Sequence, residues 1–395
     1  MKKNKILIIT GDITCFNLLN EFALSFLDAS YQRRYIPEIL YIDTLDESSF
    51  QILVNFDGIA MVGFQTNLFT LEINPGIYMG NLINVPMYDY ILDSPTSKRQ
   101  YFEPHIGGLT FCYHDDSYID YVKTYFPHVN VIWQPPGGGV TGMEKSPVLF
   151  DKNRKYDLSF VGTYTDYRDV LKVASSELPD WAEIMFSYFD FLISNPKISV
   201  NTAIKEFIAR YQLNVTSSEI PALLEILYPA EKAARSYYRE RVVEFIINNG
   251  IHIDVFSESW KNSPYADNPY ISVHKDIEYR DSMDVMRNSK LSLNVFSWHK
   301  ASMTERIANI MLNGAVCVSD YSSRLDSLFR NDEEIILFNL NELKEMVTRI
   351  KDILADDNKR MMIAHSGYDN AYANHRWINR VDDLFDHTGD NYNTL

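Results

Sequence analysis

The chain has 395 residues, enough for two or three domains at roughly 150 residues each, and its 46% hydrophobic and 23% charged residues are typical of a folded globular protein. Its 37 Lys and Arg against 53 Asp and Glu leave a net charge of −16, which argues against a nucleic-acid partner. The sequence has no run near the ~20 apolar residues of a membrane span, no cleavable signal and three scattered cysteines. We therefore expect a cytoplasmic protein with no integral membrane segment.

The first 150 residues alternate apolar runs with helical spacing. The run 5–10 stops at Gly11-Asp12, as a buried parallel strand would, and a helix is predicted over 17–27. Further strands are predicted over residues 39–42, 58–62, 88–92, 109–113 and 129–133. Alternation of this kind predicts a Rossmann-like α/β domain. Because Pro135-Pro136-Gly137-Gly138-Gly139 is the strongest break in the chain, we place the end of this domain at residue 150.

A second Rossmann-like domain is predicted over residues 151–370. It begins with an apolar strand over 156–162 and contains a helical insertion over about 175–249. Strands then recur over 251–256, 291–296, 315–319 and 334–338, and an amphipathic helix follows from 343 to 354. Residues 371–395 are predicted to form a C-terminal helix and tail, and the sequence leaves open whether this segment returns to the first domain.

The segment 302–314 carries the main candidate site. Ser302 and Glu305 have the spacing of a capping box before the helical pattern of 307–312, and Gly314 is placed to end that helix. Between two strands of a parallel sheet, the start of such a helix faces the carboxyl edge, where open α/β folds bind ligands.

Two interpretations of this helix start are open. In the first, its free N–H groups hold a diphosphate with help from Arg306 or Lys300, and Glu305 accepts two ribose hydroxyls. In the second, Glu305 only caps its own helix and the two cations are solvated side chains.

Several short runs follow one known pattern. They are MRNSKLSLNV at 286–295, TERI at 304–307, MLNGAV at 311–316 and Ser319-Asp320, together with 156–163, 238–260 and 376–380. These runs resemble the donor-binding half of the CgeB-like glycosyltransferases, which are GT-B enzymes related to the large group-1 family.

The resemblance implies a fold and a chemistry. It implies an α/β GT-B protein whose two Rossmann-like domains enclose a cleft, with the nucleotide on the second domain and the acceptor entering from the first. It implies a bacterial hexosyltransferase-type enzyme that moves a sugar from a nucleotide-sugar, with UDP favoured, to a protein or glycan. No cofactor and no metal are expected, because the nucleotide-sugar is a substrate, and retention of configuration is favoured by kinship.

The predicted site residues follow from the helix start and from this resemblance. The donor-binding candidates are Gly162, Thr163, His274, Tyr279, Trp298, His299, Lys300, Ser302, Thr304, Glu305, Arg306 and Asn309. Relatives carry a glutamate three residues after the arginine, where this chain has Asn309, so either Glu305 or the Asn309 amide is left to take the ribose role. We prefer Glu305, which is also the catalytic candidate.

In the first domain, Gly11 and Asp12 are candidates for the cleft and His114 is a candidate catalytic base. His114-Asp115-Asp116 imitates a metal cluster, but directly after a strand it favours a polar loop. We therefore predict no metal site.

The alternative function is a catalytically degenerate GT-B protein that binds or has a structural role, since Asn309 replaces the usual carboxylate. Another Rossmann-like enzyme, such as an epimerase or a dehydrogenase, is disfavoured because no Gly-x-Gly-x-x-Gly motif follows the first strand.

Overall fold

The computed structural model describes residues 4–11, 15–139, 150–296 and 299–385. The chain divides into two compact units, with unit 1 formed by residues 1–139 and 374–395 and unit 2 by residues 140–373. The boundaries predicted from the sequence were residues 150 and 370. Within the described ranges, no helix is long and apolar enough to cross a bilayer.

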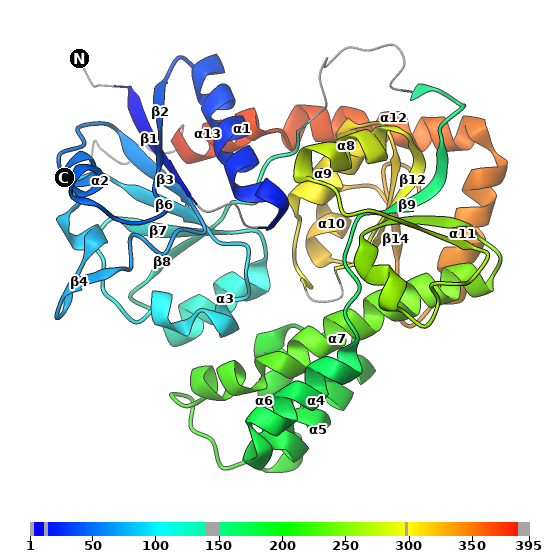
Figure 1. The fold of residues 1–395 in the computed structure, drawn as a ribbon, viewed down its shortest axis with the longest axis horizontal. Helices are drawn as coiled ribbons and strands as arrows, with labels where there is room; N and C mark the ends of the chain where they lie inside the picture. The colour runs from blue at the N-terminus through cyan, green and yellow to red at the C-terminus, as the bar shows by residue number, and fades with distance from the viewer. Residues whose placement is uncertain (1–3, 12–14, 140–149, 297–298, 386–395) are drawn as a thin grey trace. The chain divides into compact units, whose positions relative to one another are not determined.

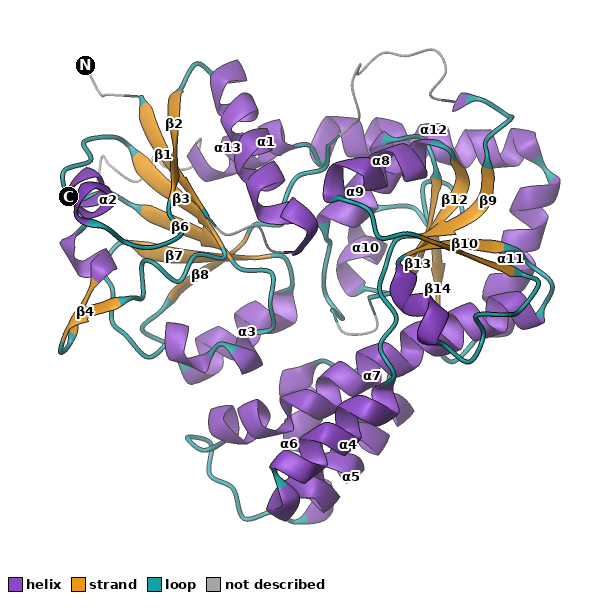
Figure 2. Cartoon of the chain, in the orientation of Figure 1, coloured by secondary structure: helices purple, strands orange, loops and turns teal. Residues whose placement is uncertain are grey.

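Unit 1 contains a parallel six-stranded sheet in the order β2-β1-β3-β6-β7-β8 (Figures 1 and 2). Its strands are β1 (Lys5–Thr10), β2 (Ile36–Tyr41), β3 (Ala60–Phe64), β6 (Met87–Tyr90), β7 (Leu109–Tyr113) and β8 (Asn130–Trp133). The helices are α1 (Leu18–Gln32), α2 (Glu47–Val54), α3 (Asp116–Tyr125) and α13 (Trp377–Phe385), and a small hairpin pairs β4 (Glu72–Asn74) with β5 (Ile77–Tyr78).

The last helix that the structure describes, α13, belongs to unit 1 and packs against α1. Trp377 is 4% exposed, and its ring lies 5.1 Å from the ring of Phe22 and 5.8 Å from that of Phe64, between centroids. Arg33 of α1 forms an ion pair with Asp382 of α13. Aromatic burial of this kind explains why the C-terminal segment is held against the first sheet.

Unit 2 contains a second parallel sheet, in the order β11-β10-β9-β12-β13-β14. Its strands are β9 (Tyr156–Phe160), β10 (Ile253–Phe256), β11 (Ile271–His274), β12 (Ser289–Asn294), β13 (Val316–Asp320) and β14 (Ile336–Phe338). Its helices are α4 (Tyr167–Glu177), α5 (Ala182–Ser194), α6 (Val200–Tyr211), α7 (Ile220–Asn248), α8 (Tyr279–Arg287), α9 (Glu305–Leu312), α10 (Ser323–Leu328), α11 (Leu343–Ala355) and α12 (Asp357–Asn374).

The predicted α/β class with two parallel sheets is confirmed, and the predicted helical insertion consists of α4 to α7. Figure 1 shows α4, α5 and α6 gathered beside one end of α7. The other end of α7 reaches the sheet, so this 29-residue helix links the insertion to the core of unit 2.

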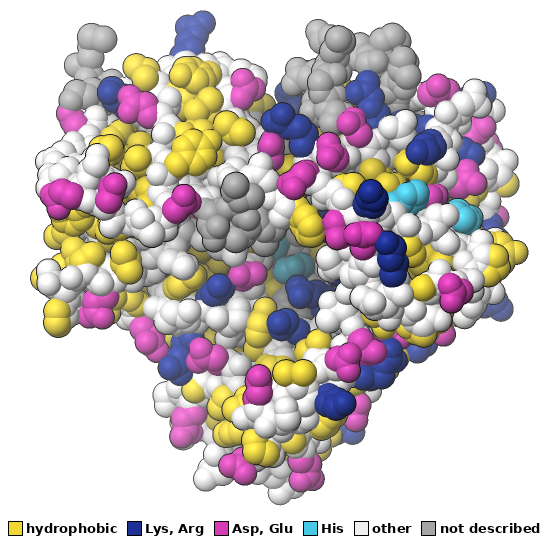
Figure 3. Space-filling view, in the orientation of Figure 1, with side chains coloured by type: hydrophobic (Ala, Val, Ile, Leu, Met, Phe, Trp, Pro, Cys, Tyr) yellow, Lys and Arg dark blue, Asp and Glu magenta, His cyan; other side chains and the backbone are white. Residues whose placement is uncertain are grey.

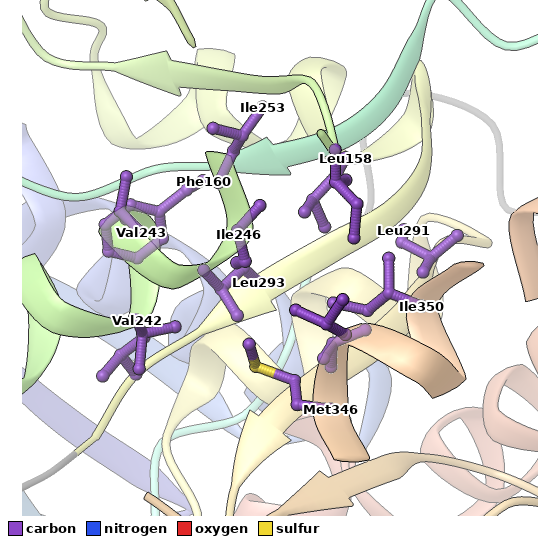
Figure 4. Close-up of a cluster of buried hydrophobic side chains, with 14 of the residues drawn as sticks. Leu158, Phe160, Val242, Val243, Ile246, Ile253, Leu291, Leu293, Met346 and Ile350 are labelled. Atoms are coloured by element: carbon purple, nitrogen blue, oxygen red, sulfur yellow. The ribbon is translucent and has the colours of Figure 1, made fainter. Parts of the chain in front are cut away.

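The core of unit 2 is a continuous layer of hydrophobic side chains between the sheet and two helices (Figure 4). It joins strand residues to side chains of α7 and α11, namely Leu158, Phe160, Ile253, Leu291, Leu293, Val242, Val243, Ile246, Met346 and Ile350. Each of these ten side chains is fully buried. At ~25 cal/mol per Å² of apolar surface, such burial is the main stabilising contribution to this unit.

Two strand regions were not predicted from the sequence. The edge strand β11 has the sequence ISVH, and the hairpin β4–β5 has strands of three and two residues. Neither forms an apolar run, because an edge strand and a surface hairpin are solvated on at least one side.

Candidate functional site

The strand order of unit 2 reverses direction between β9 and β12. These two strands are neighbours in the sheet, although 128 residues lie between the end of β9 and the start of β12. Chain connections from these two strands leave toward opposite sides, and the crevice outside their carboxyl ends is where open α/β sheets bind ligands. The segment after β9 contains Gly162 and Thr163, and the segment after β12 leads to α9.

The segment after β9 is held in a fixed path. The indole Nε1 of Trp260 donates to the carbonyl of Gly162 at 2.8 Å, and the backbone N–H of Tyr164 donates to Ser259 Oγ at 2.8 Å. A Cβ on Gly162 would lie 2.6 Å from the Phe160 ring. A side chain at this position would therefore press on the buried Phe160 ring, which would have to shift.

The segment before α9 is tied to the end of β13. The carboxylate of Asp320 accepts from the backbone N–H of Phe296 at 2.6 Å. Ser322 Oγ accepts from the N–H of Ser302 at 2.8 Å and donates to its carbonyl at 2.7 Å. These bonds fix the entry to α9 from the neighbouring strand.

The predicted N-cap is wrong. Helix α9 begins at Glu305 with Thr304 as its N-cap residue, and Thr304 makes no side-chain capping bond. Ser302 lies two residues before this N-cap and is not part of the helix. Ser322 Oγ binds both the backbone N–H and the backbone carbonyl of Ser302, which holds the chain in a non-helical conformation at that residue. Among the described residues, the buried Oγ of Ser302 has no hydrogen-bond partner.

Glu305 lies at the start of its own helix and is half-buried. Burial raises the pKa of its carboxyl, whereas the charge of Arg306 and the backbone N–H groups of Glu305 and Arg306 lower that pKa in part. Glu305 is the first residue of α9 rather than the third, so it does not complete the predicted capping box with Ser302. A half-exposed carboxylate in this position also remains accessible to a ligand hydroxyl.

A group of arginines from two elements meets at this edge. Arg239 of α7 donates from Nη1 to the carbonyl of Thr163 at 2.9 Å, and its guanidinium lies 5.7 Å from the Phe160 ring centroid. Burial lowers the pKa of Arg239 to about 9, with further lowering by the charges of Arg235 and Arg306, while Asp320 raises it. The guanidinium remains protonated at neutral pH.

Lys300 adds a fourth cation near this group, since its Nζ lies 6.0 Å from the ring of Tyr238, the residue before Arg239. We call Arg235, Arg239, Lys300 and Arg306 the cation cluster. Like charges repel one another, whereas the charges of Glu305 and Asp320 act in the opposite direction on Arg306 and Arg239. The buried Nε of Arg239 has no hydrogen-bond partner within the described ranges. The arrangement therefore suits a multiply charged anion such as a diphosphate.

Sequence reasoning missed two members of the cation cluster. Arg239 lies in the run 238–260 but was not predicted as a site residue, and neither was Arg235. Their spacing of four residues within a largely apolar helix places both on one face, and this was the signal available. Its meaning depended on where that face lies in the fold.

Tyr279 and Asn309 form a structural pair between α8 and α9. Asn309 is 1% exposed and donates from Nδ2 to the Tyr279 hydroxyl at 2.9 Å. Its backbone carbonyl accepts from Asn313 Nδ2 at 2.8 Å. With its amide inside the protein, Asn309 is less suited than Glu305 to bind a ribose.

His274 is not brought to the cation cluster. It is the last residue of β11, two strands away from β9 in the sheet order. Its Nε2 lies 2.7 Å from Asp254 Oδ1 and its ring stacks on Phe256 at 4.4 Å between centroids. The His299 ring packs edge-on against Phe296 at 6.0 Å, and the predicted site residue Trp298 lies outside the described residues.

In unit 1, His114 follows β7 and is 2% exposed. Burial lowers its pKa to about 4, so the ring is neutral and shielded from solvent. A catalytic base must reach the hydroxyl that it deprotonates, and for this reason we do not retain His114 in the catalytic set. Asp115 is the N-cap of α3 and accepts from the N–H of Ser117 at 2.7 Å, which agrees with a polar loop.

The other first-domain candidates lie at the end of β1. Gly11 passes so close to β2 that a Cβ would lie 2.1 Å from the Ile42 carbonyl oxygen. Asp12 lies outside the described residues. In the part of the chain that the structure describes, no three His, Cys, Asp or Glu residues are grouped so as to hold a metal ion.

Comparison with known proteins places this site in context. Residues 235–386, which include the whole cation cluster, match the family model described as "Glycosyl transferase-like". A search of curated protein sequences finds no match.

Solved structures give wider coverage. An α-glucosyltransferase in complex with UDP and a 13-mer DNA is 12% identical, covering 97% of this chain and 98% of that chain with a TM-score of 0.57. A glycosyltransferase from Rickettsia africae ESF-5 is 8% identical, with 97% of each chain covered and a TM-score of 0.52. A DNA-modifying β-glucosyltransferase is 11% identical, covering 97% and 99% with a TM-score of 0.53. The chain has the GT-B fold, as predicted.

Proposed function

We propose that this protein is a glycosyltransferase that uses a nucleotide-diphosphate sugar, with UDP as the favoured nucleotide, and that the cation cluster binds the diphosphate. The observation that carries the proposal is the placement of Arg239 at the β9–β12 switch point, beside Arg235 and Arg306. The family-model match and the UDP bound in a structure of the same fold support it. The assignment to the CgeB-like group remains a prediction.

The proposed chemistry assigns a role to each group. Arg239, Arg306 and Lys300 stabilise the negative charge that develops on the diphosphate as the bond to the sugar breaks. Their charges would take the part that a divalent metal plays in other transferases, so we propose metal-independent transfer. Glu305 accepts hydroxyl hydrogen bonds from the ribose. Retention of configuration and a cytoplasmic location are part of the same proposal.

We propose a protein or glycan acceptor rather than nucleic acid, although one of the compared structures is a complex with DNA and another is of a DNA-modifying enzyme. The net charge is −16, and basic and acidic side chains are interspersed over the face shown in Figure 3. DNA binding depends on many phosphate contacts from a basic surface.

A second candidate is a GT-B protein that binds the nucleotide but does not turn it over. The observation in its favour is Asn309, which stands where relatives carry a carboxylate and donates a hydrogen bond to the Tyr279 hydroxyl. Both candidates predict nucleotide binding, and only the first predicts release of UDP from a UDP-sugar.

Thermal-shift measurements with UDP, GDP, ADP, UMP and uridine test the first step. A ligand that binds only the folded protein raises its melting temperature, and we expect the largest rise with UDP and little with uridine. UDP release from UDP-glucose and UDP-N-acetylglucosamine, followed with and without EDTA, tests the second step. No shift with any nucleoside diphosphate would refute the proposed function, and binding without release from either sugar donor would favour the second candidate.

A further inference from the structure

The backbone between β9 and α4 is held by side chains from other elements. We call residues 162–164 the β9 loop. Two of its carbonyls accept side-chain hydrogen bonds, that of Gly162 from Trp260 and that of Thr163 from Arg239. The N–H groups of the same two loop residues form no hydrogen bond within the part of the chain that the structure describes. Gly162 is half-buried and Thr163 is exposed, so a ligand can approach this stretch of backbone.

A buried tryptophan holds the first half of the β9 loop. Trp260 belongs to residues 257–260, which follow β10 and which we call the β10 turn. It is fully buried, and its ring centroid lies 6.2 Å from that of Phe160 and 5.2 Å from that of Tyr164. The indole therefore packs against residues on both sides of Gly162, and close packing keeps its N–H directed at the Gly162 carbonyl.

A chain of hydroxyl groups holds the second half of the loop. The N–H of Tyr164 donates to Ser259 Oγ at 2.8 Å, and Ser259 Oγ lies 2.8 Å from Ser257 Oγ. Ser257 Oγ donates to Asp276 Oδ1 at 2.7 Å, and the same oxygen accepts from the N–H of Glu258 at 3.3 Å. Because the Ser257 proton goes to Asp276, Ser259 is the donor between the two hydroxyls. Hydrogen bonds in such a chain strengthen one another, and this one ends on a carboxylate.

Packing alone does not require a hydrogen bond of this kind. Trp377 of unit 1 is 4% exposed, yet its Nε1 has no hydrogen-bond partner within the described residues. Ring contacts hold its indole, as they hold that of Trp260. The bond from Trp260 to the Gly162 carbonyl therefore adds a specific restraint on the loop to the packing of the ring.

We infer that Trp260 and the hydroxyl chain from Ser259 to Asp276 are positioning residues, which hold the β9 loop so that its two N–H groups meet the donor diphosphate. Successive backbone N–H groups bind anions in this way. The inference rests on the proposed transferase function and adds to it residues that act through the loop.

The size of the effect follows from how the loop is restrained. A loop that loses one of these bonds spends less time in the binding conformation, and the apparent affinity for the ligand falls by the same fraction. Since the net contribution of one hydrogen bond corresponds to a factor of about three to ten, we expect a loss of UDP affinity of that size.

The experiment measures UDP affinity of the full chain by calorimetry, at a temperature where every variant is fully folded. Trp260→Phe keeps an aromatic ring and removes the N–H donor, and Ser259→Ala removes the hydroxyl that Ser259→Thr retains. Trp377→Phe is the matched control, because it removes a buried indole N–H that forms no hydrogen bond within the described residues. Melting temperatures of the unliganded proteins are recorded in parallel.

We expect Trp260→Phe and Ser259→Ala to weaken UDP binding by about three- to tenfold, and Ser259→Thr and Trp377→Phe to bind as the wild type does. A purely structural role would lower the melting temperature without changing the affinity of the folded protein.

Full UDP affinity in both Trp260→Phe and Ser259→Ala would overturn the inference and leave the proposed function standing. Equal weakening by Ser259→Thr and Ser259→Ala, or by Trp377→Phe and Trp260→Phe, would overturn it as well. If Trp260→Phe does not fold, the two Ser259 variants decide by the same criteria. Absence of UDP binding by the wild type would instead refute the proposed function.

Discussion

Arg239→Met is the sharpest test of the cation cluster. Methionine keeps an unbranched apolar stem that can pack on Phe160 but removes the guanidinium. In the unliganded protein the variant loses the hydrogen bond to the Thr163 carbonyl, worth about 1 kcal/mol. It also relieves the repulsion from Arg235 and Arg306. Since these effects oppose each other, we expect the melting temperature of the unliganded protein to change by only a few degrees.

The liganded protein should respond much more strongly. A charged hydrogen bond to a diphosphate is worth about 1.5–3 kcal/mol, so the affinity for UDP should fall by about 10- to 150-fold. Isothermal titration calorimetry at fixed ionic strength measures this change, and comparison with uridine should show no difference between wild type and variant.

Arg241→Met is the matched control. Arg241 lies two residues further along the same helix, is exposed, donates from Nη1 to the Tyr237 hydroxyl at 3.0 Å and lies 6.0 Å from that ring. It therefore makes the same kinds of contact on another face of α7. Equal weakening of UDP binding by both variants, or full affinity in Arg239→Met, would show that the cation cluster does not bind the diphosphate.

Glu305→Gln should weaken UDP binding about tenfold in calorimetry and leave the unliganded protein at least as stable at pH 7. Because the folded pKa of this carboxyl is raised, its ionisation makes the folded protein less stable as the pH rises through that pKa. Unchanged UDP affinity would show that Glu305 does not bind the ribose. His114 and His375 have pKa values lowered by burial from 6.5 to about 4 and about 3, so their neutral rings stabilise unit 1 fully above pH 6.5 and progressively less as the pH falls. In His114→Asn, the free energy of unfolding measured by circular dichroism should fall less between pH 6.5 and pH 4 than in the wild type, by about 3 kcal/mol at most. An unchanged pH dependence of the unfolding free energy would contradict a buried neutral ring at His114. Trp377→Ala should cost about 3–5 kcal/mol in urea unfolding, whereas Tyr31→Ala, at a position 57% exposed, should cost under 1 kcal/mol; similar costs would argue against docking of α13 on unit 1.

Much of the fold follows from local sequence. The runs 5–10 and 109–113 were predicted to be strands and are β1 and β7, since strands buried on both faces consist of continuous apolar residues. Helix α9 ends at Leu312, with Asn313 as its C-cap residue and Gly314 in the left-handed region at φ 73°, as the Asn-Gly pair predicted. The start of α9 could not be predicted, because Ser302 is engaged by Ser322, a residue on a different strand connection.

The candidate site shows the same division. The sequence by itself determined that the start of a helix near residue 305, with the basic residues Lys300 and Arg306, would lie at a sheet edge, because βαβ connectivity dictates that position. Only the tertiary structure decided that Arg239 joins them, since Arg239 lies more than 60 residues earlier in the chain and reaches this edge by its contact with Thr163, after the end of β9. The tertiary structure also decided the burial of His114 and Asn309. Local patterns report which face of an element is apolar, whereas the partner of that face is set by packing between distant segments.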